Sequence, residues 1–568
     1  MEGGNTNGHV NGHVSGHTNG PKSDHTDNHT NGDTNGQQVP YHIREKRLGE
    51  PLELRIITIG AGASGLNLAY QLNRHMRNVT HVVYEKNPEV GGTWYENRYP
   101  GYSDAPQILE YFRMVAKKHE LYRYIKLSHE VIGANWDDVK GIWTIKVKEL
   151  TTGDVFEDWC HFMISGSGIL NNWKWPNIPG LHTFKGQLLH SAAWDMSADW
   201  RGKKVAVLGC GSSGVQVVPT IQPDVKQLIT FIRTPTWITA GFAQSKAGPN
   251  GANFAFSESQ KQDFRTRPDA YLKYRKELES EMNRRFQFII KDSPEQAEAV
   301  RFSINEMTTK LGVDSPLLKH LIPTFSVGCR RPTPGNGYLE ALTKDNVRVV
   351  TDAITEIVPD GIKTATGEII KVDMFICATG FDISFCPRYP VVGRHNTELG
   401  KQWKERPTAY LSLAAPNFPN HFMFLGPNAP IGHGSVLPIV EHSTKYIIRM
   451  LHKCQTQGIK AVEAKQEAVD DFTEHVDTFV ERAAWTSHCR SWFKNDKIDG
   501  PIVALHPGSR VHWFHMLENP RFEDYNWTPF DKNRFFYLGN GFSTKEAEDR
   551  DSTYYFDHPD EGFETISY

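Results

Sequence analysis

The stretch that decides the fold is residues 54–65, Leu-Arg-Ile-Ile-Thr-Ile-Gly-Ala-Gly-Ala-Ser-Gly. Its apolar, β-branched first half, Leu54–Gly60, is typical of a buried parallel strand that ends at a glycine. Residues 65–72 have helical character, and 81–85 (HVVYE) indicate the next strand. This order of strand, helix and strand predicts a Rossmann-like unit that binds a dinucleotide.

The glycines of this unit have separate tasks. Gly60 permits the tight turn after the strand, Gly62 lets the backbone approach a pyrophosphate, and Gly65 lets helix and strand pack closely. Ser64 lies in the first helical turn, where free N–H groups and the helix dipole favour phosphate. Glu85 follows after about 20 residues, the usual place for a carboxylate that accepts hydrogen bonds from a ribose.

A second unit of the same kind spans residues 204–233. The strand KVAVLG (204–209) leads into a helix from Ser213, and the strand 227–233 ends in Arg233 followed by Thr234. An arginine in place of an acid suits a 2′-phosphate, so the preferred nucleotide is NADPH. The predicted contacts in this second glycine turn are Gly209, Gly211, Ser212, Ser213 and Gly214.

Two dinucleotide units in one chain indicate electron transfer from a nicotinamide to a flavin. Disulfide reductases share this layout but need a redox CxxC pair, which this sequence lacks. The missing pair favours oxygen as the acceptor for the reduced flavin. The seven cysteines are scattered and odd in number, so the sequence predicts neither a disulfide framework nor a zinc site.

Composition narrows the class of protein further. With 63 basic and 66 acidic residues the net charge is −3, which gives no electrostatic reason to expect nucleic acid or an anionic membrane as partner. No stretch has the apolar length of a membrane span or of a secretory signal. We therefore expect a soluble, cytoplasmic protein without metal; its oligomeric state is left open by the sequence.

The chain length of 568 residues indicates two or three domains. The predicted fold class is α/β, with two Rossmann-like domains and a helical insertion in the second. We expect the flavin-binding domain to be discontinuous, 46–168 and 383–568, and the nicotinamide-binding domain to span 169–382. Its charged, helical insertion is expected at about 242–324, with one long stretch at 257–291.

The N-terminal segment 1–45 consists mainly of Gly, Asn, His, Thr and Asp. Such a segment buries too little apolar surface to offset the entropy of ordering it, so we expect a disordered tail. His9, His13 and His17 recur every four residues, as metal ligands on a helix would. The glycines and asparagines between them disfavour a helix, and a metal site is not expected.

The segment FKGQLLHSAAWD (184–195) reproduces the FxGxxxHxxxW[P/D] fingerprint of the type I Baeyer–Villiger monooxygenases. Residues 91–101 (GGTWYENRYPG) resemble the second signature of that family. Further resemblances are CRRP (329–332), ATGF (378–381) and CRSWF (489–493). The chain most resembles fungal members that act in secondary metabolism on polyketide or terpenoid ketones.

The resemblance implies a reaction and two central residues. FAD reduced by NADPH would react with O₂ to a C4a-peroxyflavin, which would attack a ketone and yield an ester or lactone. Arg331 matches the active-site arginine, whose permanent charge can stabilise an oxyanion. Asp104 matches the carboxylate that holds this arginine and contacts FAD.

The resemblance also implies cofactor contacts at other positions. Arg330 matches a basic residue that binds the NADPH phosphate, and Trp492 lies in a loop that senses NADP⁺. Thr93, Trp94 and the backbone of Val131 match FAD contacts. In the fingerprint, we interpret His190 as a structural residue near the domain hinge and Trp194 as core. Phe184, Gly186 and Asp195 complete that motif.

The chain departs from the family after Gly101. The signature continues YPGxxxD, whereas Asp104 arrives one residue early and Ala105 already indicates the next helix. An aromatic segment that relatives have beside the flavin is missing. A shortened active-site wall, a mis-spliced gene model and a paralogue without activity each explain this departure.

Alternatives remain for the reaction and the pocket. An N- or S-oxygenating flavin monooxygenase is the nearest enzymatic alternative, although its fingerprint lacks the ending seen at Trp194-Asp195. The other alternative is a protein without this activity, either a non-catalytic partner subunit or a catalytically impaired paralogue. The loop from Gly426 to Ser435, with Leu437, lines the substrate pocket or serves only for packing.

Overall fold

The computed structural model describes residues 41–101, 105–239, 241, 243–248, 254–547 and 549–556. The chain divides into two units, 1–43 and 44–568, and the account below concerns the second. Most of the predicted tail, including His9, His13 and His17, lies outside the described residues.

The first parallel sheet has the strand order β19-β7-β1-β2-β3, and every neighbouring pair in it is parallel. Helix α1 (Ala63–His75) follows the central strand, so the first glycine turn lies where the strand order reverses. A ligand crevice is expected at this point of an open α/β sheet. The strands are β1 (Leu54–Ile59), β2 (Val79–Tyr84), β3 (Ile125–Lys126), β7 (Phe162–Ser165) and β19 (His421–Met423).

The second parallel sheet, β13-β10-β9-β17-β8, repeats this plan. Its central strand β9 leads into helix α4 (Ser212–Ile221), which places the second glycine turn at the equivalent edge. The prediction of two Rossmann-like units in an α/β fold is confirmed. The strands are β8 (Gln187–His190), β9 (Lys204–Leu208), β10 (Gln227–Phe231), β13 (Val347–Val350) and β17 (Met374–Cys377).

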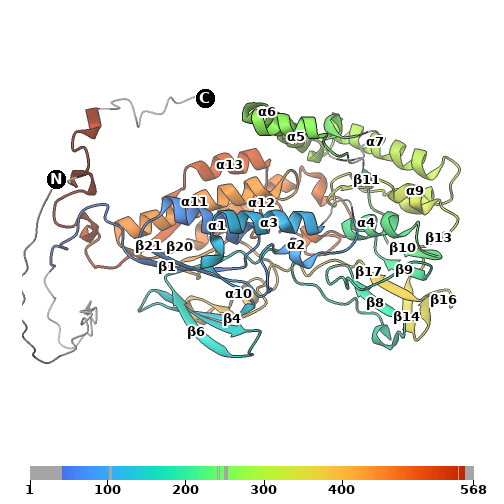
Figure 1. Ribbon diagram of the computed structural model, residues 1–568, viewed down its shortest axis with the longest axis horizontal. Helices are drawn as coiled ribbons and strands as arrows, with labels where there is room; N and C mark the ends of the chain where they lie inside the picture. The colour runs from blue at the N-terminus through green and yellow to red at the C-terminus, as the bar shows by residue number, and fades with distance from the viewer. Residues whose placement is uncertain are drawn as a thin grey trace, which may run out of the picture. The chain divides into compact units, whose positions relative to one another are not determined.

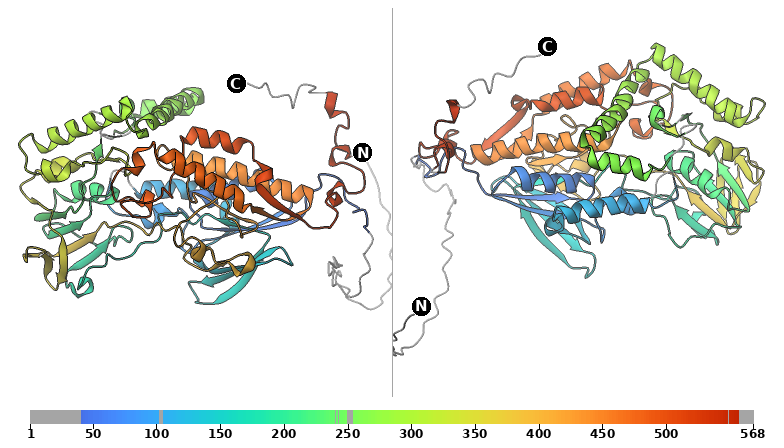
Figure 2. Two further views of the ribbon diagram at one scale, coloured as in Figure 1. Left: turned by 180° about the vertical axis from the view of Figure 1, so that it is seen from behind. Right: turned by 45° about the horizontal axis from the view of Figure 1, so that its top comes forward.

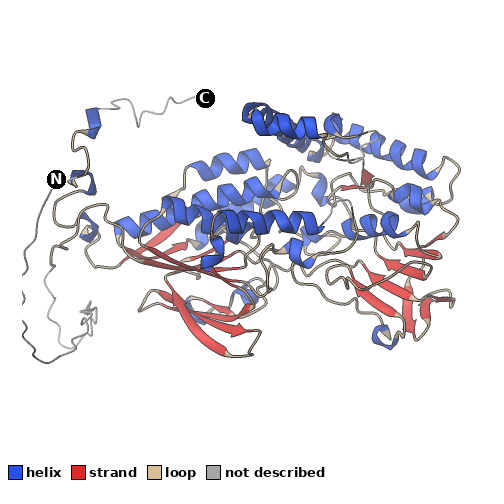
Figure 3. Ribbon diagram, viewed as in Figure 1, coloured by secondary structure: helices blue, strands red, loops and turns tan. Residues whose placement is uncertain are grey.

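Long helices cover one side of the first sheet, and a smaller mixed sheet, with one parallel and two antiparallel strand pairs, lies on the other (Figure 1). The helices are α1, α3 (Ala105–Lys118), α11 (Val436–Gln457), α12 (Gln466–Val480) and α13 (Arg510–Glu518). Figure 3 shows how they gather above the strands. The small sheet consists of β4 (His129–Asp137), β5 (Ile142–Glu149), β6 (Val155–Cys160) and β18 (Val391–Val392).

The predicted helical insertion is present, but its first part is two helices and not one (Figure 2). A proline at the first position of α6 ends the preceding helix, because proline cannot continue an i→i−4 ladder from the turn before it. Ser257 caps α5 and Ser293 caps α7. The helices are α5 (Glu258–Thr266), α6 (Pro268–Arg284), α7 (Pro294–Leu311) and α8 (Leu318–Leu321).

Shorter elements connect these layers. They are α2 (Thr93–Glu96), α9 (Tyr338–Leu342), α10 (Leu399–Gln402), β11 (Ile238–Thr239), β12 (Thr333–Pro334), β14 (Ile354–Val358), β15 (Gly361–Thr364), β16 (Ile369–Lys371), β20 (Ile459–Ala464) and β21 (Tyr525–Pro529). Among the helices that the structure describes, none is long and apolar enough to cross a membrane.

Buried histidines make stability depend on pH. Burial lowers the pKa of His81 to about 3 and the pKa values of His190, His421 and His433 to about 4. In the unfolded chain these imidazoles titrate near the ordinary value of about 6.5. Between these values the unfolded state binds more protons, so the stability present above pH 6.5 is lost as the pH falls toward 4.

We therefore expect the melting temperature to fall between pH 7.5 and pH 4.5. A thermal-shift series across this range measures the effect, and the same series on His421→Gln is expected to show a shallower fall. A melting temperature that stays constant over this range would contradict the assignment of neutral, buried imidazoles.

Candidate functional site

The first glycine turn is built by close approach of backbone to backbone. Gly60 has a φ of +101°, and a Cβ there would lie 2.7 Å from the carbonyl oxygen of Gly166. A Cβ at Gly65 would lie 2.0 Å from the carbonyl oxygen of Gly60. Neither position accepts a side chain, so the N-terminus of α1, including Ser64, is held directly at the end of β1.

Glu85 closes this turn from the neighbouring strand. Its Oε2 accepts the N–H of Ala61 at 2.7 Å, and its Oε1 accepts the N–H of Asn87 at 2.8 Å. Burial raises the pKa of the Glu85 carboxyl, whereas these two donors lower it. A carboxylate oxygen has lone pairs beyond these bonds, so the group can also accept from ribose hydroxyls.

The GGTW segment lies against this turn. The N–H of Gly91 donates to the carbonyl of Ala61 at 3.0 Å, and a Cβ at Gly92 would lie 2.9 Å from the Cα of Gly62. Of the predicted FAD contacts, Thr93 is exposed at the start of α2, Trp94 is half-buried and Val131 is buried in β4.

The connection from the GGTW segment to α3 is short. Helix α3 begins at Ala105, four residues after Gly101. A Cβ at Gly101 would lie 2.7 Å from Oε1 of Gln216 in α4, so the YPG segment touches the second nucleotide unit. Asp104, which the sequence pairs with Arg331, lies outside the described residues.

The second glycine turn is built in the same way as the first, but the space at Gly211 is open. A Cβ at Gly214 would lie 2.1 Å from the carbonyl oxygen of Gly209, whereas a Cβ at Gly211 would meet nothing within 4 Å. Gly211 and Ser212 are exposed, Ser213 is half-buried, and all three lie at the N-terminus of α4. This open space at a helix N-terminus fits an anionic pyrophosphate.

Arginines gather beside the second turn. Arg233 lies exposed just after β10, next to Thr234. Nη1 of Arg330 donates to the carbonyl of Pro235 at 3.4 Å, and its buried Nε has no hydrogen-bond partner. Burial lowers the pKa of Arg330, and the cations Arg233 and Arg490 lower it further, whereas Asp496 opposes them.

Arg331 lies in the loop before β12, two residues from Thr333. The hydroxyl of Thr333 is 3.2 Å from Oγ of Ser212, which places Arg331 close to the second glycine turn. Its side chain is exposed, yet the surrounding protein lowers its pKa by desolvation. Within the described residues its guanidinium makes no ion pair or side-chain hydrogen bond.

The fingerprint histidine lies between the two segments that connect the sheets, 166–186 and 378–390. Its ring stacks on Trp173 with centroids 4.5 Å apart, and its Nε2 is 3.1 Å from Oγ1 of Thr379. Nδ1 accepts the N–H of Ala192, so the ring is neutral with its proton on Nε2. This environment suits a hinge residue better than a proton donor.

The rest of the fingerprint is structural. Phe184 and Trp194 are buried, which agrees with the interpretation of Trp194 as core. A Cβ at Gly186 would lie 2.4 Å from the carbonyl oxygen of Asp373. Oδ1 of Asp195 accepts the N–H and the hydroxyl of Ser197, which lowers the pKa of this carboxyl.

A cleft of about 420 Å³ opens next to the fingerprint. It is lined by α2, by residues 171–173 and by Trp194 and Arg388. The N–H of Asp382 donates to the carbonyl of Asn172 at 2.7 Å, so the two connecting segments also contact each other directly. The cleft therefore lies at the predicted hinge.

One prediction about the cysteines is wrong. Cys329 and Cys489 form a disulfide, although they are 160 residues apart in the sequence. The spacing of cysteines cannot reveal such a pair, because the fold alone brings distant segments together. Trp492, the predicted NADP⁺ sensor, is half-buried three residues after Cys489 and packs edge-on against Phe493.

The loop from Gly426 to Ser435 is partly a packing loop. The Asn428 amide is buried and donates to the carbonyls of Ile502 and Leu505 at 2.9 and 3.1 Å. Leu437, in the first turn of α11, is 47% exposed and available to a ligand. In the described part of the chain, no three metal-ligating side chains converge.

The sequence is similar to those of known flavin-binding proteins. Residues 91–288 match the flavin-binding monooxygenase-like family. The chain is 38% identical to the FAD-binding monooxygenase tazF of Aspergillus terreus, over 89% of this chain and 95% of that protein. It is 30% identical to a Baeyer–Villiger monooxygenase of Streptomyces coelicolor, over 81% of this chain and 90% of that protein.

A solved structure supports the same assignment. Cyclohexanone monooxygenase from Rhodococcus bound to NADP⁺ superimposes with a TM-score of 0.73 at 25% identity, covering 84% of this chain and all of that one. The chain therefore belongs to the flavin-binding monooxygenases and is also similar to proteins named Baeyer–Villiger monooxygenases. It is an enzyme, a flavoprotein monooxygenase.

Proposed function

We propose that this enzyme is an NADPH- and O₂-dependent Baeyer–Villiger monooxygenase, which inserts one oxygen atom beside a ketone carbonyl to give an ester or lactone. The observation that supports this most is Arg331, a guanidinium without an ion pair among the described residues, two residues from the strand that touches the second glycine turn. A flavin monooxygenase that oxidises soft amines or sulfides has less need of a fixed cation beside the reacting oxygen.

The proposed cofactors fit the two turns. FAD is assigned to the first turn, in the domain 46–168 and 383–568, and NADPH to the second, in 169–382. The space above Gly211 admits a pyrophosphate, and the unpartnered Nε of Arg330 offers a donor to a phosphate. Bound FAD, once reduced by NADPH, supplies the activated oxygen.

The protein's own part is electrostatic. Arg331 stays protonated despite its lowered pKa, because a guanidinium does not deprotonate in a protein. It can therefore stabilise negative charge on the attacking oxygen and on the former carbonyl oxygen without donating its proton. His190, neutral between the two connecting segments, positions the domains.

The proposed substrate is a polyketide or terpenoid ketone of fungal secondary metabolism, and the proposed location is the cytoplasm. This rests on the fungal relative that matches nearly the whole chain. The exposed side chains of Leu437 and Arg331 offer an apolar and a cationic contact to such a ketone.

The test supplies purified protein with FAD, NADPH, ¹⁸O₂ and a panel of cyclic and polycyclic ketones, with an amine and a sulfide as comparison. Products carrying one ¹⁸O atom as esters or lactones are expected. Label found only in N-oxides or sulfoxides would replace the proposal by an N/S-oxygenase.

A second candidate is a paralogue impaired in oxygenation. Two observations favour it. Helix α3 starts only four residues after Gly101, and no described carboxylate pairs with Arg331. Such a protein would stay colourless with added FAD, or would oxidise NADPH and release hydrogen peroxide without oxygenated product. A stable yellow holoenzyme that forms lactone excludes it.

A further inference from the structure

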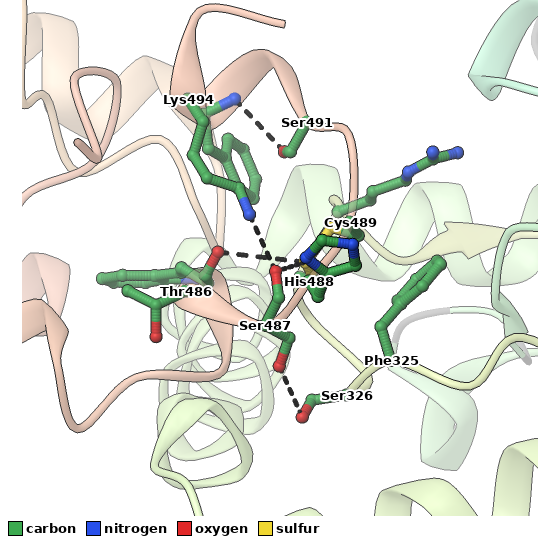
Figure 4. The surroundings of a disulfide bond; sticks show 12 residues. Phe325, Ser326, Thr486, Ser487, His488, Cys489, Ser491 and Lys494 are labelled. Atoms are coloured by element: carbon green, nitrogen blue, oxygen red, sulfur yellow. Dashed lines mark hydrogen bonds between the residues drawn. A yellow bond between two sulfur atoms is a disulfide. The ribbon is translucent and has the colours of Figure 1, made fainter. Parts of the chain in front are cut away.

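The Cys329–Cys489 disulfide joins two loops that belong to different halves of the predicted architecture (Figure 4). Cys329 lies between α8 and β12, in the nicotinamide half, and Cys489 lies in the segment 484–498 of the flavin half. Their Cα atoms are 6.5 Å apart, and both residues are buried. The bond is therefore a covalent tie between the two halves.

Other contacts hold the segment 484–498 together around this tie. Nζ of the buried Lys494 donates to the carbonyls of Ser487 and Ile498 at 2.7 and 2.6 Å. Ser487 in turn donates from its hydroxyl to Ser326 at 2.7 Å, next to the disulfide in Figure 4. The segment has its own internal support, so loss of the disulfide would loosen its attachment to Cys329 more than its internal fold.

Each cysteine of the pair directly precedes an arginine. Arg330 follows Cys329, and Arg490 follows Cys489. Arg490 is exposed and donates from Nη1 to the carbonyl of Asp496 at 3.1 Å, which leaves its other donors available. The disulfide thus brings a cation of the flavin half to the arginines of the second glycine turn.

The resulting cluster is rich in cations. In the described chain, Arg233, Arg330 and Arg490 form no ion pair within 4 Å, although Asp496 acts on Arg330 from farther away. Like charges that gather without a carboxylate are unfavourable until an anion joins them. A phosphate dianion with several acceptor oxygens suits three guanidinium groups.

We propose that Arg490 is a third ligand of the NADPH 2′-phosphate, beside Arg233 and Arg330, and that the Cys329–Cys489 disulfide holds it in place. The thiol–disulfide state then sets the preference for NADPH over NADH. This inference rests on the assignment of NADPH to the second glycine turn.

The redox step involves a dithiol reductant. It transfers two electrons and two protons, the S–S bond breaks, two thiols form, and the reductant closes into its own disulfide. The freed Cys329 thiol lies 3.1 Å from the carbonyl oxygen of Ser487, to which it can donate. Because the bond is buried, reduction is expected to need local opening and to be slow.

The experiment measures dissociation constants of NADP⁺ and NAD⁺ by calorimetric titration of the purified full-length protein. Arg490→Gln is expected to weaken NADP⁺ binding about tenfold, the range of a charge-assisted hydrogen bond, and to leave NAD⁺ unchanged. Cys489→Ser and dithiothreitol-reduced wild type are expected to weaken NADP⁺ by about three- to tenfold, again without effect on NAD⁺.

Matched variants distinguish the loss of this phosphate contact from a general loss of structure. Arg482→Gln removes an exposed charge of the same flavin half, and Cys386→Ser removes a half-buried free cysteine. Both should bind NADP⁺ like wild type and respond to reductant as it does, whereas Cys489→Ser should no longer respond. Intact mass after alkylation reports the state of the disulfide in each sample.

Three results would overturn the inference: Arg490→Gln with wild-type NADP⁺ affinity, equal losses for NADP⁺ and NAD⁺, or free Cys329 and Cys489 thiols in oxidant-treated protein. Because binding is measured without turnover, its outcome is independent of oxygenation. A protein that makes no lactone but shows the expected pattern loses the proposed function and keeps the inference. Absence of any NADP⁺ binding contradicts both.

Discussion

Replacing Arg331 by alanine is expected to lower ketone oxygenation by about a thousandfold, while NADPH continues to be oxidised. Removal of one donor from an oxyanion site typically costs a factor of about 10²–10³, and the expected loss for a permanent cation is the upper end of this range. Reduction of the flavin requires no cation at the substrate carbonyl, so it should survive.

Product formation and NADPH consumption are measured together, with hydrogen peroxide as the readout of lost coupling. Arg331→Lys is expected to recover a part of the rate, because the charge returns without the planar fork of donors. Arg348→Ala removes an arginine of β13 and breaks its exposed ion pair with Glu368; this variant is the control and should behave like wild type. Wild-type lactone formation in Arg331→Ala would remove this residue from the chemistry.

Gly211→Ala is expected to abolish tight NADP⁺ binding without affecting the fold. Its added Cβ would meet no protein atom within 4 Å, so the unliganded protein should melt like wild type. The same methyl group would occupy the space in which a pyrophosphate approaches the backbone, and a loss of affinity of about a hundredfold or more follows. Flavin absorbance should be retained.

Gly214→Ala provides the contrast. Its Cβ would lie 2.1 Å from a backbone carbonyl oxygen, so we expect destabilisation of about 1–3 kcal/mol or more, the usual cost of overpacking, and a lower melting temperature. Titration and thermal denaturation of both variants check this pair. Tight NADP⁺ binding by Gly211→Ala would place the dinucleotide elsewhere.

The two Rossmann-like units could be predicted because their signals are local. Gly60 adopts a φ of +101°, which favours glycine, and β1 is buried on both faces, which favours an apolar run. Both signals lie within a dozen residues of the sequence. The break at Pro268 was missed, although proline at a first helical position ends whatever precedes it. Helix α11 was missed although its buried residues recur at helical spacing from Ile439 to Cys454.

The site was less predictable wherever it depends on contacts between distant segments. Nothing near His190 in the sequence shows that Trp173 and Thr379 enclose its ring. The Cys329–Cys489 pair also arises only in the folded chain, although both motifs begin with Cys-Arg. That shared beginning is the one sequence signal that could have suggested the arginine cluster.

The position of β19 has a consequence for synthesis on the ribosome. The first sheet takes its edge strand, residues 421–423, from beyond the whole second sheet, and this strand pairs with β7 at 162–165. The second sheet, whose last strand in the sequence is β17, can therefore form while the first sheet still lacks a strand. During that interval β7 presents an unpaired, apolar edge to the solvent, so nascent chains stalled between these points should be the form that chaperones retain most strongly.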